Sequence, residues 1–134
     1  MPVATTSGEQ VVEAVVAGPD GANRLYTVTG AAGIAINVSA GQTQTQTWTS
    51  LVGPTFTRGQ FYRAIGTASV SSQSAILQTT SGNFVLAISS VEADLDDESG
   101  RVEVRVEVYL SSSTGGPQLS VNQVRYWVTV LAQI

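Results

Sequence analysis

The sequence of 134 residues contains no cysteine, no histidine and no lysine. Without histidine and cysteine it has no Ser-His-Asp triad, no Cys-His pair and none of the usual zinc ligands. Without lysine it has no P-loop and no Schiff-base residue. These absences exclude most catalytic devices, so we expect a protein that is not an enzyme and has no cofactor. The lack of cysteine also excludes disulfide bonds.

Charge is scarce as well. Charged residues make up 12% of the chain, against roughly 25% in an average protein. The net charge of −4 and the scattered arginines argue against nucleic acids and anionic membranes as partners. Two explanations fit the low charge: a simple compositional bias, or a surface that is covered in an assembly, because interface cores are depleted of charge.

Long hydrophobic runs are also missing. No stretch of about 18 apolar residues is present, so we expect no transmembrane helix. Residues 1–10 show neither the basic nor the apolar part of a signal peptide, so we expect no secretion signal. Residues 1–8 are predicted to be a polar leader, and residues 9–134 are predicted to form one domain.

The clearest pattern lies near the C-terminus, where apolar and polar residues alternate strictly over residues 101–110. Such alternation indicates a β-strand with one buried face. Residues 84–96 and 119–134 show related patterns, so we expect a long three-stranded meander. One row of the middle strand is apolar and consists of Val102, Val104, Val106, Val108 and Leu110.

The turn between the first two of these strands predicts how they pair. Residues 97–100 suit a four-residue hairpin loop, because Asp opens a turn and Gly takes the left-handed conformation that closes it. With Asp96 opposite Arg101, Leu95 lies opposite Val102. The hydrophobic pattern and the opposite charges then favour one and the same register.

Residues 9–17 allow two interpretations. A capping box and four valines on one side would fit a helix. The valine content favours a strand instead, paired with residues 25–29 across the turn at residues 18–21. We favour the hairpin.

Turn signals recur along the rest of the chain and separate about eight or nine strands, including one at residues 31–39. A short helix at residues 60–65 is an alternative for that segment. We therefore predict an all-β protein, an antiparallel β-sandwich or jelly roll with the C-terminal meander and at most one short helix.

The stretch at residues 42–49 alternates threonine and glutamine and ends in a tryptophan, so neither face of this strand would be apolar. Three interpretations stay open: an edge strand, a strand that pairs with another chain, or a sugar site where the indole stacks on a sugar ring and amides bind its hydroxyls. The candidate residues are Gln44, Gln46 and Trp48 on one face of this strand, and Thr45 and Thr47 on the other.

Trp127 is the second aromatic of interest. Alternation places it on one face with Arg125, and in the predicted meander also with Glu103 and Arg105. A tryptophan on so charged a face should be covered by another sheet, another subunit or a ligand.

The acidic hairpin tip is a candidate Ca²⁺ site, because this hard cation prefers several oxygen ligands. The D-x-D-D-E spacing resembles half of an EF-hand loop but lacks its glycine and its distal glutamate. The alternative is a solvated acidic turn beside Arg101. The candidate ligands are Asp94, Asp96, Asp97 and Glu98.

Two function classes follow. The first is a non-catalytic structural protein that self-associates into a homo-oligomer, a particle or a fibre, such as a subunit of a virion or phage; its location would be a virion or a cytoplasmic assembly. The second is a carbohydrate-binding module that holds a glycan against an exposed tryptophan. A weaker third class is a glycoside hydrolase with two carboxylates, but seven of the ten acidic residues lie at residues 92–107, where the hairpin already explains them.

Overall fold

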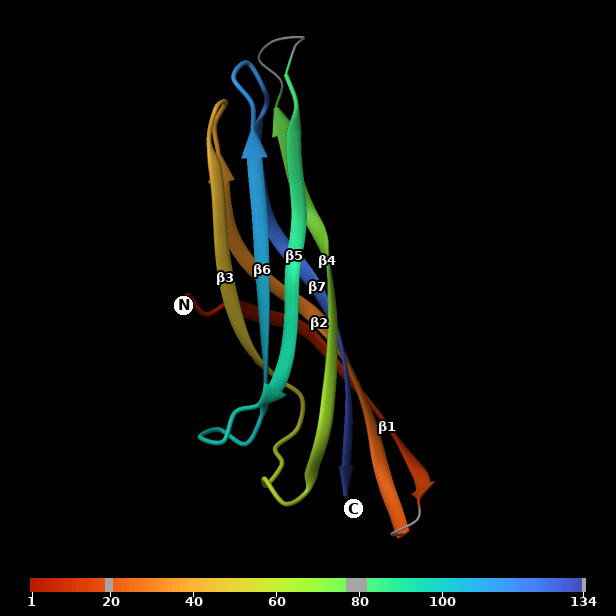
Figure 1. The fold of residues 1–134 in the computed structure, drawn as a ribbon. Helices are drawn as coiled ribbons and strands as arrows, with labels where there is room; N and C mark the ends of the chain where they lie inside the picture. Colours follow the sequence, from red (N-terminus) through yellow and green to blue (C-terminus); the bar gives the residue numbers. More distant parts are fainter. Residues whose placement is uncertain (19–20, 77–81, 134) are drawn as a thin grey trace.

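The computed structural model describes residues 1–18, 21–76 and 82–133 and shows an all-β protein (Figure 1). This described part contains seven strands and no helix, and no helix in it could therefore cross a membrane. The prediction of an antiparallel sandwich is confirmed. The strands are β1 (Thr5–Gly18), β2 (Gly21–Val38), β3 (Thr43–Val52), β4 (Phe61–Ile76), β5 (Phe84–Leu95), β6 (Val102–Ser112) and β7 (Gln118–Gln133).

The strand number is seven in the described part rather than eight or nine, because short predicted strands are pieces of longer ones. Residues 25–29 and 31–39, for example, belong to the single strand β2 almost entirely. The helix suggested at residues 60–65 is wrong, since β4 begins at Phe61 after a turn at residues 58–60.

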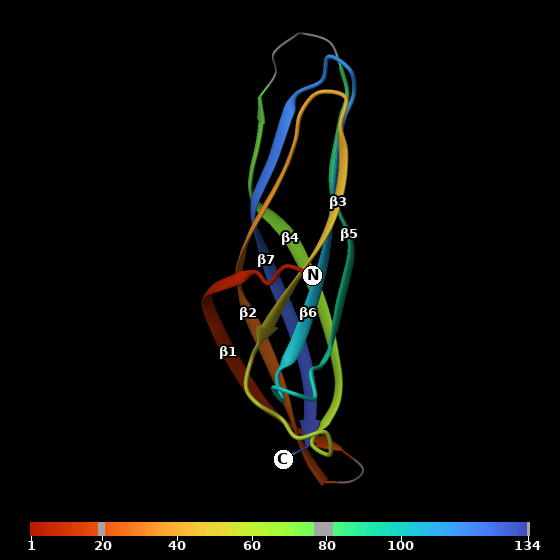
Figure 2. The ribbon, with the colours of Figure 1, turned by 90° about the vertical axis from the view of Figure 1, so that its left-hand side faces the viewer.

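Two antiparallel sheets face each other across the core, as the side view shows (Figure 2). One has the order β1-β2-β7-β4 and the other the order β3-β6-β5. The predicted three-stranded meander is therefore wrong in its last strand: β5 and β6 form a hairpin, but β7 lies in the opposite sheet between β2 and β4. Its apolar row is buried by facing β6 across the core rather than by lying beside it.

The register predicted for the β5–β6 hairpin is confirmed, with Leu95 opposite Val102 and Glu92 opposite Arg105. The hydrophobic pattern decides this register because a slip by one residue would turn the apolar row of each strand toward solvent. A shift between Ile88 and Ser90, where β5 carries one extra residue, was not predicted.

The core lies between the inward rows of β6 and β7. Both rows hold mostly valine, whose branched side chain suits a sheet surface. Further apolar residues from β2 and β3 complete it. Fully buried members are Val28, Ile36, Val52, Val102, Val104, Val108, Leu110, Leu119, Val121, Val124, Val128 and Val130.

The N-terminal hairpin is confirmed, because β1 pairs with β2 from Thr5 opposite Gly33 to Gly18 opposite Gly21. The helix interpretation is wrong. β1 begins inside the segment expected to be a polar leader, and residues 19–20 of the predicted turn lie outside the described residues. Before β1, Ala4 and Pro2 hydrogen bond with the backbone of Thr49, so the N-terminal segment also lies along β3.

Candidate interaction surface

The strand β7 presents Trp127 on the outer side of the four-stranded sheet. Its even-numbered residues Tyr126 and Val128 point into the core and are buried, so alternation turns Trp127 outward. The Trp127 side chain is 56% exposed. Arg125 shares this face, as predicted, whereas the predicted neighbours Glu103 and Arg105 lie on β6 in the other sheet.

Residues opposite one another in the sheet extend this surface across all four strands. Thr27 on β2 lies opposite both Val12 on β1 and Thr129 on β7, and Thr129 lies opposite Ile65 on β4. Val12 is 66% exposed and Ile65 is 58% exposed. A row of exposed and half-buried side chains therefore crosses the sheet from edge to edge.

Two parallel rows flank it, and together the three rows are called the outer face below. One row contains Trp127 between Thr29 and Thr67, and the other contains Leu25 and Leu131. Arg63 is the only charged member. The outer face consists of Gln10, Val12, Ala14, Leu25, Thr27, Thr29, Arg63, Ile65, Thr67, Trp127, Thr129 and Leu131.

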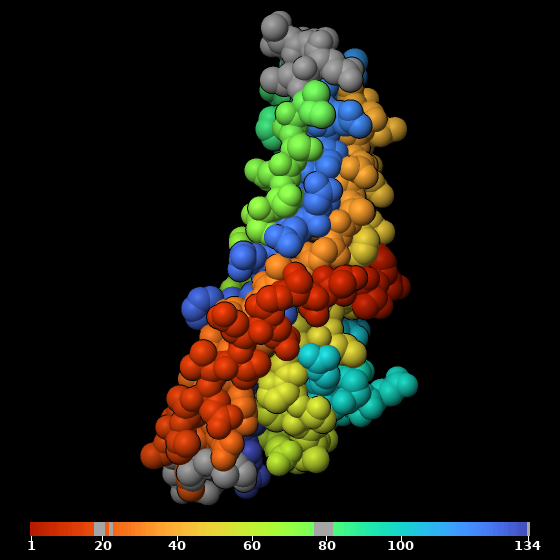
Figure 3. Space-filling model, turned by 180° about the vertical axis from the view of Figure 1, so that it is seen from behind, coloured from red at the N-terminus to blue at the C-terminus, as the bar shows by residue number. Residues whose placement is uncertain are grey.

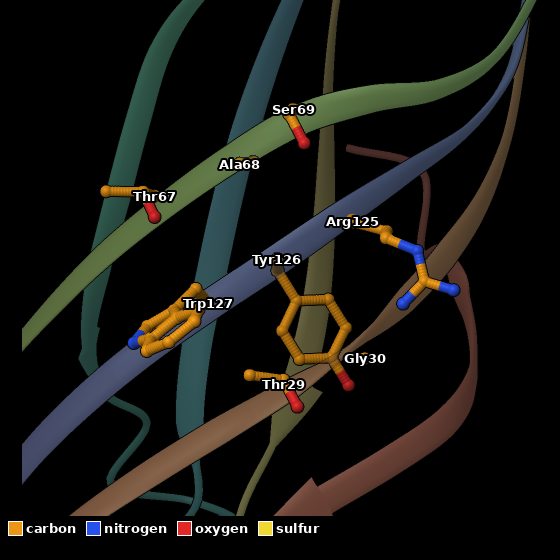
Figure 4. A pocket seen from close by; sticks show the side chains of 8 residues that line it. All are labelled: Thr29, Gly30, Thr67, Ala68, Ser69, Arg125, Tyr126 and Trp127. Atoms are coloured by element: carbon orange, nitrogen blue, oxygen red, sulfur yellow. The ribbon is translucent and has the colours of Figure 1, made fainter.

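An open hollow of about 460 Å³ lies beside Trp127. Figure 4 shows the indole of Trp127 between Thr67 and Thr29, with Arg125 and Ser69 farther along the same strands. Among the described residues, no acidic side chain lies within salt-bridge distance of Arg125. The hollow thus offers an aromatic ring, hydroxyls and a cation without a salt-bridge partner, and no pair of groups suited to acid-base catalysis.

Tyr126, beneath the hollow, is a buried residue whose hydroxyl belongs to a partly exposed polar cluster. Its hydroxyl donates a hydrogen bond to a Glu9 carboxylate oxygen at 3.2 Å, and the same oxygen accepts one from the Gly53 amide at 3.0 Å. Arg101 lies 3.7 Å from the other Glu9 oxygen. Burial, followed by the negative charge of Glu9, raises the pKa of the Tyr126 hydroxyl above its ordinary value.

The second predicted tryptophan lies elsewhere. Trp48 is opposite Val106 on the inward row of β3 and packs against the core. Its indole nitrogen is buried and has no hydrogen-bond partner among the described residues. Trp48 therefore does not form a platform open to solvent, and it shares no surface with Trp127.

The polar residues of this stretch occupy an edge. β3 borders the three-stranded sheet, which agrees with a strand that has no apolar face. Thr45 is exposed and Thr47 is half-buried, and both lie on the outward row. Gln44, which is exposed, and Gln46, which is half-buried, belong to the inward row near the start of β3. The structure brings none of these five predicted residues near Arg125 and Trp127, which belong to the other sheet.

The acidic hairpin tip is held by hydrogen bonds and an ion pair within the protein. Asp97 accepts two hydrogen bonds from the Arg58 guanidinium, at 2.8 and 2.7 Å, which lowers the pKa of its carboxyl. The pKa of Asp96 is lowered as well, first by the hydrogen bond from the Ser99 hydroxyl and then by the one from the Ser99 amide at 3.0 Å. Asp94 accepts from the Leu95 amide, while Glu98 is exposed.

Within residues 1–18, 21–76 and 82–133, no three acidic residues are grouped so that they could hold a metal ion. The geometry therefore gives the half EF-hand spacing no support. Arg58 forms an ion pair with Asp97, and the sequence did not predict that Arg58 lies beside this turn.

Sequence reasoning missed Val12, Ala14 and Ile65 as parts of one surface with Trp127. The alternation within each strand shows which residues share a face, but the strand order is needed to bring four strands together. Comparison with protein-family models, with curated proteins and with solved structures finds no match.

Proposed function

We propose that this chain is a non-catalytic structural protein that self-associates through the outer face of its four-stranded sheet. The exposed outer face carries this proposal: Trp127, Ile65 and Val12 are each more than half exposed. Several large apolar residues exposed on one surface are typical of an interaction site. A neighbouring tryptophan and arginine, as at Trp127 and Arg125, are also the residue types that contribute most to interface energies.

The low charge of the chain supports a more specific role, as a repeated subunit of a particle, a fibre or a virion. Only 12% of its residues are charged, and surfaces that become buried in an assembly are depleted of charge. Such a role requires no catalytic group.

Molar mass in solution, measured by light scattering on a sizing column at two concentrations, tests self-association. We expect a stable multiple of 13.9 kDa for the wild type and a lower mass for Trp127→Ala. Phe84→Ala is the matched control, because Phe84 is also an aromatic residue with 50% exposure but lies on β5 in the other sheet. A wild-type mass of one chain at both concentrations would contradict the proposal.

The hollow beside Trp127 favours one second candidate, a carbohydrate-binding module. A sugar ring can stack on the indole while its hydroxyls bond with Thr29, Thr67 and Arg125. This candidate predicts that a glycan quenches tryptophan fluorescence in a monomeric protein and that Trp127→Ala removes the quenching. No response across a broad glycan panel would count against it.

A further inference from the structure

We propose that β1 pairs with β1 of a second copy, edge to edge and antiparallel, with Ala14 of one copy opposite Ala14 of the other. This inference rests on the proposed self-association and names the contact that joins two subunits. The pairing would turn two four-stranded sheets into one continuous sheet of eight strands.

The position of β1 leaves one of its sides free. β1 borders the four-stranded sheet, with β2 as its only neighbour in the order of the described strands. Figure 3 shows β1, in red, crossing the surface of the molecule. From Gln10 to Gly18 the register with β2 has no shift, so this stretch has no bulge and presents a regular row of outward-pointing N–H and C=O groups.

The side chains of β1 are those of a strand buried on both faces. Val12 and Val16, on the side of the sheet that carries the outer face, are 66% and 39% exposed, and Val11 and Val15 on the opposite side are 45% and 67% exposed. Continuous valine-rich runs are typical of strands that are covered on both faces. Isolated proteins usually protect such an edge with charged residues, proline or a bulge. From Gln10 to Gly18, β1 has no proline and no register shift, and Glu13 is its one charged residue.

One register pairs the whole stretch from Gln10 to Gly18 with its copy. Opposite residues of a two-fold antiparallel pair must point to the same face, so the centre of the pair falls on a residue. With Ala14 at the centre, Val12 lies opposite Val16 and the whole stretch from Gln10 to Gly18 is paired. A centre at Glu13 would place two carboxylates opposite each other, which is destabilising, and a centre at Val12 would pair a shorter stretch because of the shift before Gln10.

Charge agrees with this choice. In the Ala14-centred register, each Glu13 lies opposite a Val15 rather than opposite the other Glu13. Each Glu13 also keeps its own counter-charge, because Arg24 of β2 lies 3.1 Å from its carboxylate. The second copy therefore meets an apolar strand with an internally neutralised acid.

A charge exchange at the centre tests the pairing. Ala14 is exposed, so a charged side chain fits there in the separate subunit. We expect Ala14→Lys alone and Ala14→Glu alone to halve the assembled molar mass, since each would place two like charges face to face. A mixture of the two variants should restore the wild-type mass. Thr45→Lys, on the edge strand β3, is the control and should leave the mass unchanged.

Cysteine cross-linking measures the register, because the chain has no natural cysteine. Ala14→Cys should form a disulfide-linked dimer on mild oxidation. Val12→Cys alone should link poorly, but it should link with Val16→Cys when the two variants are mixed. Failure of these links, or a different best pair, would overturn the inference.

The outcomes separate this inference from the proposed function. If Trp127→Ala lowers the mass but Ala14→Lys and Ala14→Glu do not, the subunits associate without β1 and only the edge pairing is wrong. If Ala14→Cys never forms a disulfide-linked dimer, and the amides of β1 are protected from hydrogen exchange only after a different protein is added, β1 binds a strand of another chain. A wild-type protein that is monomeric at all concentrations would overturn both.

Discussion

Tyr126 is a buried phenol packed beneath a glycine. Gly30 on β2 lies opposite it, and a Cβ atom at Gly30 would stand 2.6 Å from Cζ of the tyrosine ring. The missing side chain therefore makes the space in which the Tyr126 hydroxyl reaches Glu9. A glycine in the middle of a long strand thus has a packing reason that the sequence pattern does not show.

The buried Tyr126 hydroxyl predicts loss of stability in alkali. Its folded-state pKa is raised, while in the unfolded chain a tyrosine titrates at about 10. Its contribution to the free energy of unfolding is thus complete below pH ~10 and falls as the pH rises further, because only the unfolded chain then loses the proton. Urea unfolding at about pH 9 and about pH 11 should show a steeper loss for the wild type than for Tyr126→Phe.

Tyr62→Phe serves as the control, because Tyr62 is 48% exposed on β4. This variant should lose stability in alkali as the wild type does. An equal loss for Tyr126→Phe and the wild type would contradict the prediction.

At the scale of elements, the loop between β5 and β6 depends on Gly100. Gly100 has a φ of 72°, and a Cβ atom there would lie 2.9 Å from the backbone oxygen of Phe56. Two effects therefore oppose a side chain at this position: the left-handed conformation, and contact with a backbone that has little freedom to move.

Gly41 separates the two effects, because its φ of 78° is similar while the nearest atom to its Cβ position, in Thr114, is 3.8 Å away. Gly41→Ala should cost about 1–2 kcal/mol for the conformation alone. Gly100→Ala should cost about 1–3 kcal/mol more, from overpacking. Urea unfolding measures both variants, and equal losses would show that the Phe56 contact does not matter.

The sequence predicts elements well where local chemistry and pattern agree. The β5–β6 register follows from the turn at residues 97–100 and the alternation on both sides of it. The place of β7 does not follow, because alternation shows that Val128 points inward but not which strands lie beside it. Similarly, alternation places Trp127 on one face with Arg125 but leaves open whether another sheet, another subunit or a ligand covers it, and the burial of Trp48 depends on the facing sheet.

The whole molecule is built from pairings between distant parts of the chain. Asn23 on β2 lies opposite Gln133 on β7, and Thr43 on β3 lies opposite Ser111 on β6. Chains with such non-local pairing must close long loops before contacts form, and they fold in roughly milliseconds to seconds. Stopped-flow fluorescence of Trp48, which packs against the core, should show refolding in this range.

The Trp127→Ala variant is suited to this measurement, because it leaves Trp48 as the only tryptophan and, under the proposed self-association, weakens the contact between subunits. The rate should then be independent of protein concentration. Refolding that is complete within microseconds would contradict the prediction.

The outer face reaches the free edge at Val12 and Ala14, and this continuity limits how an assembly can grow. An edge pair of β1 strands has its two-fold axis perpendicular to the sheet, so both Trp127 residues lie on the same side. A face-to-face contact between two such pairs has an axis in the plane of the sheet. Two perpendicular two-fold axes that intersect generate a closed tetramer with D₂ symmetry, and such a protein would stop at four copies. Two axes that pass each other without meeting would generate an open fibre from the same two contacts.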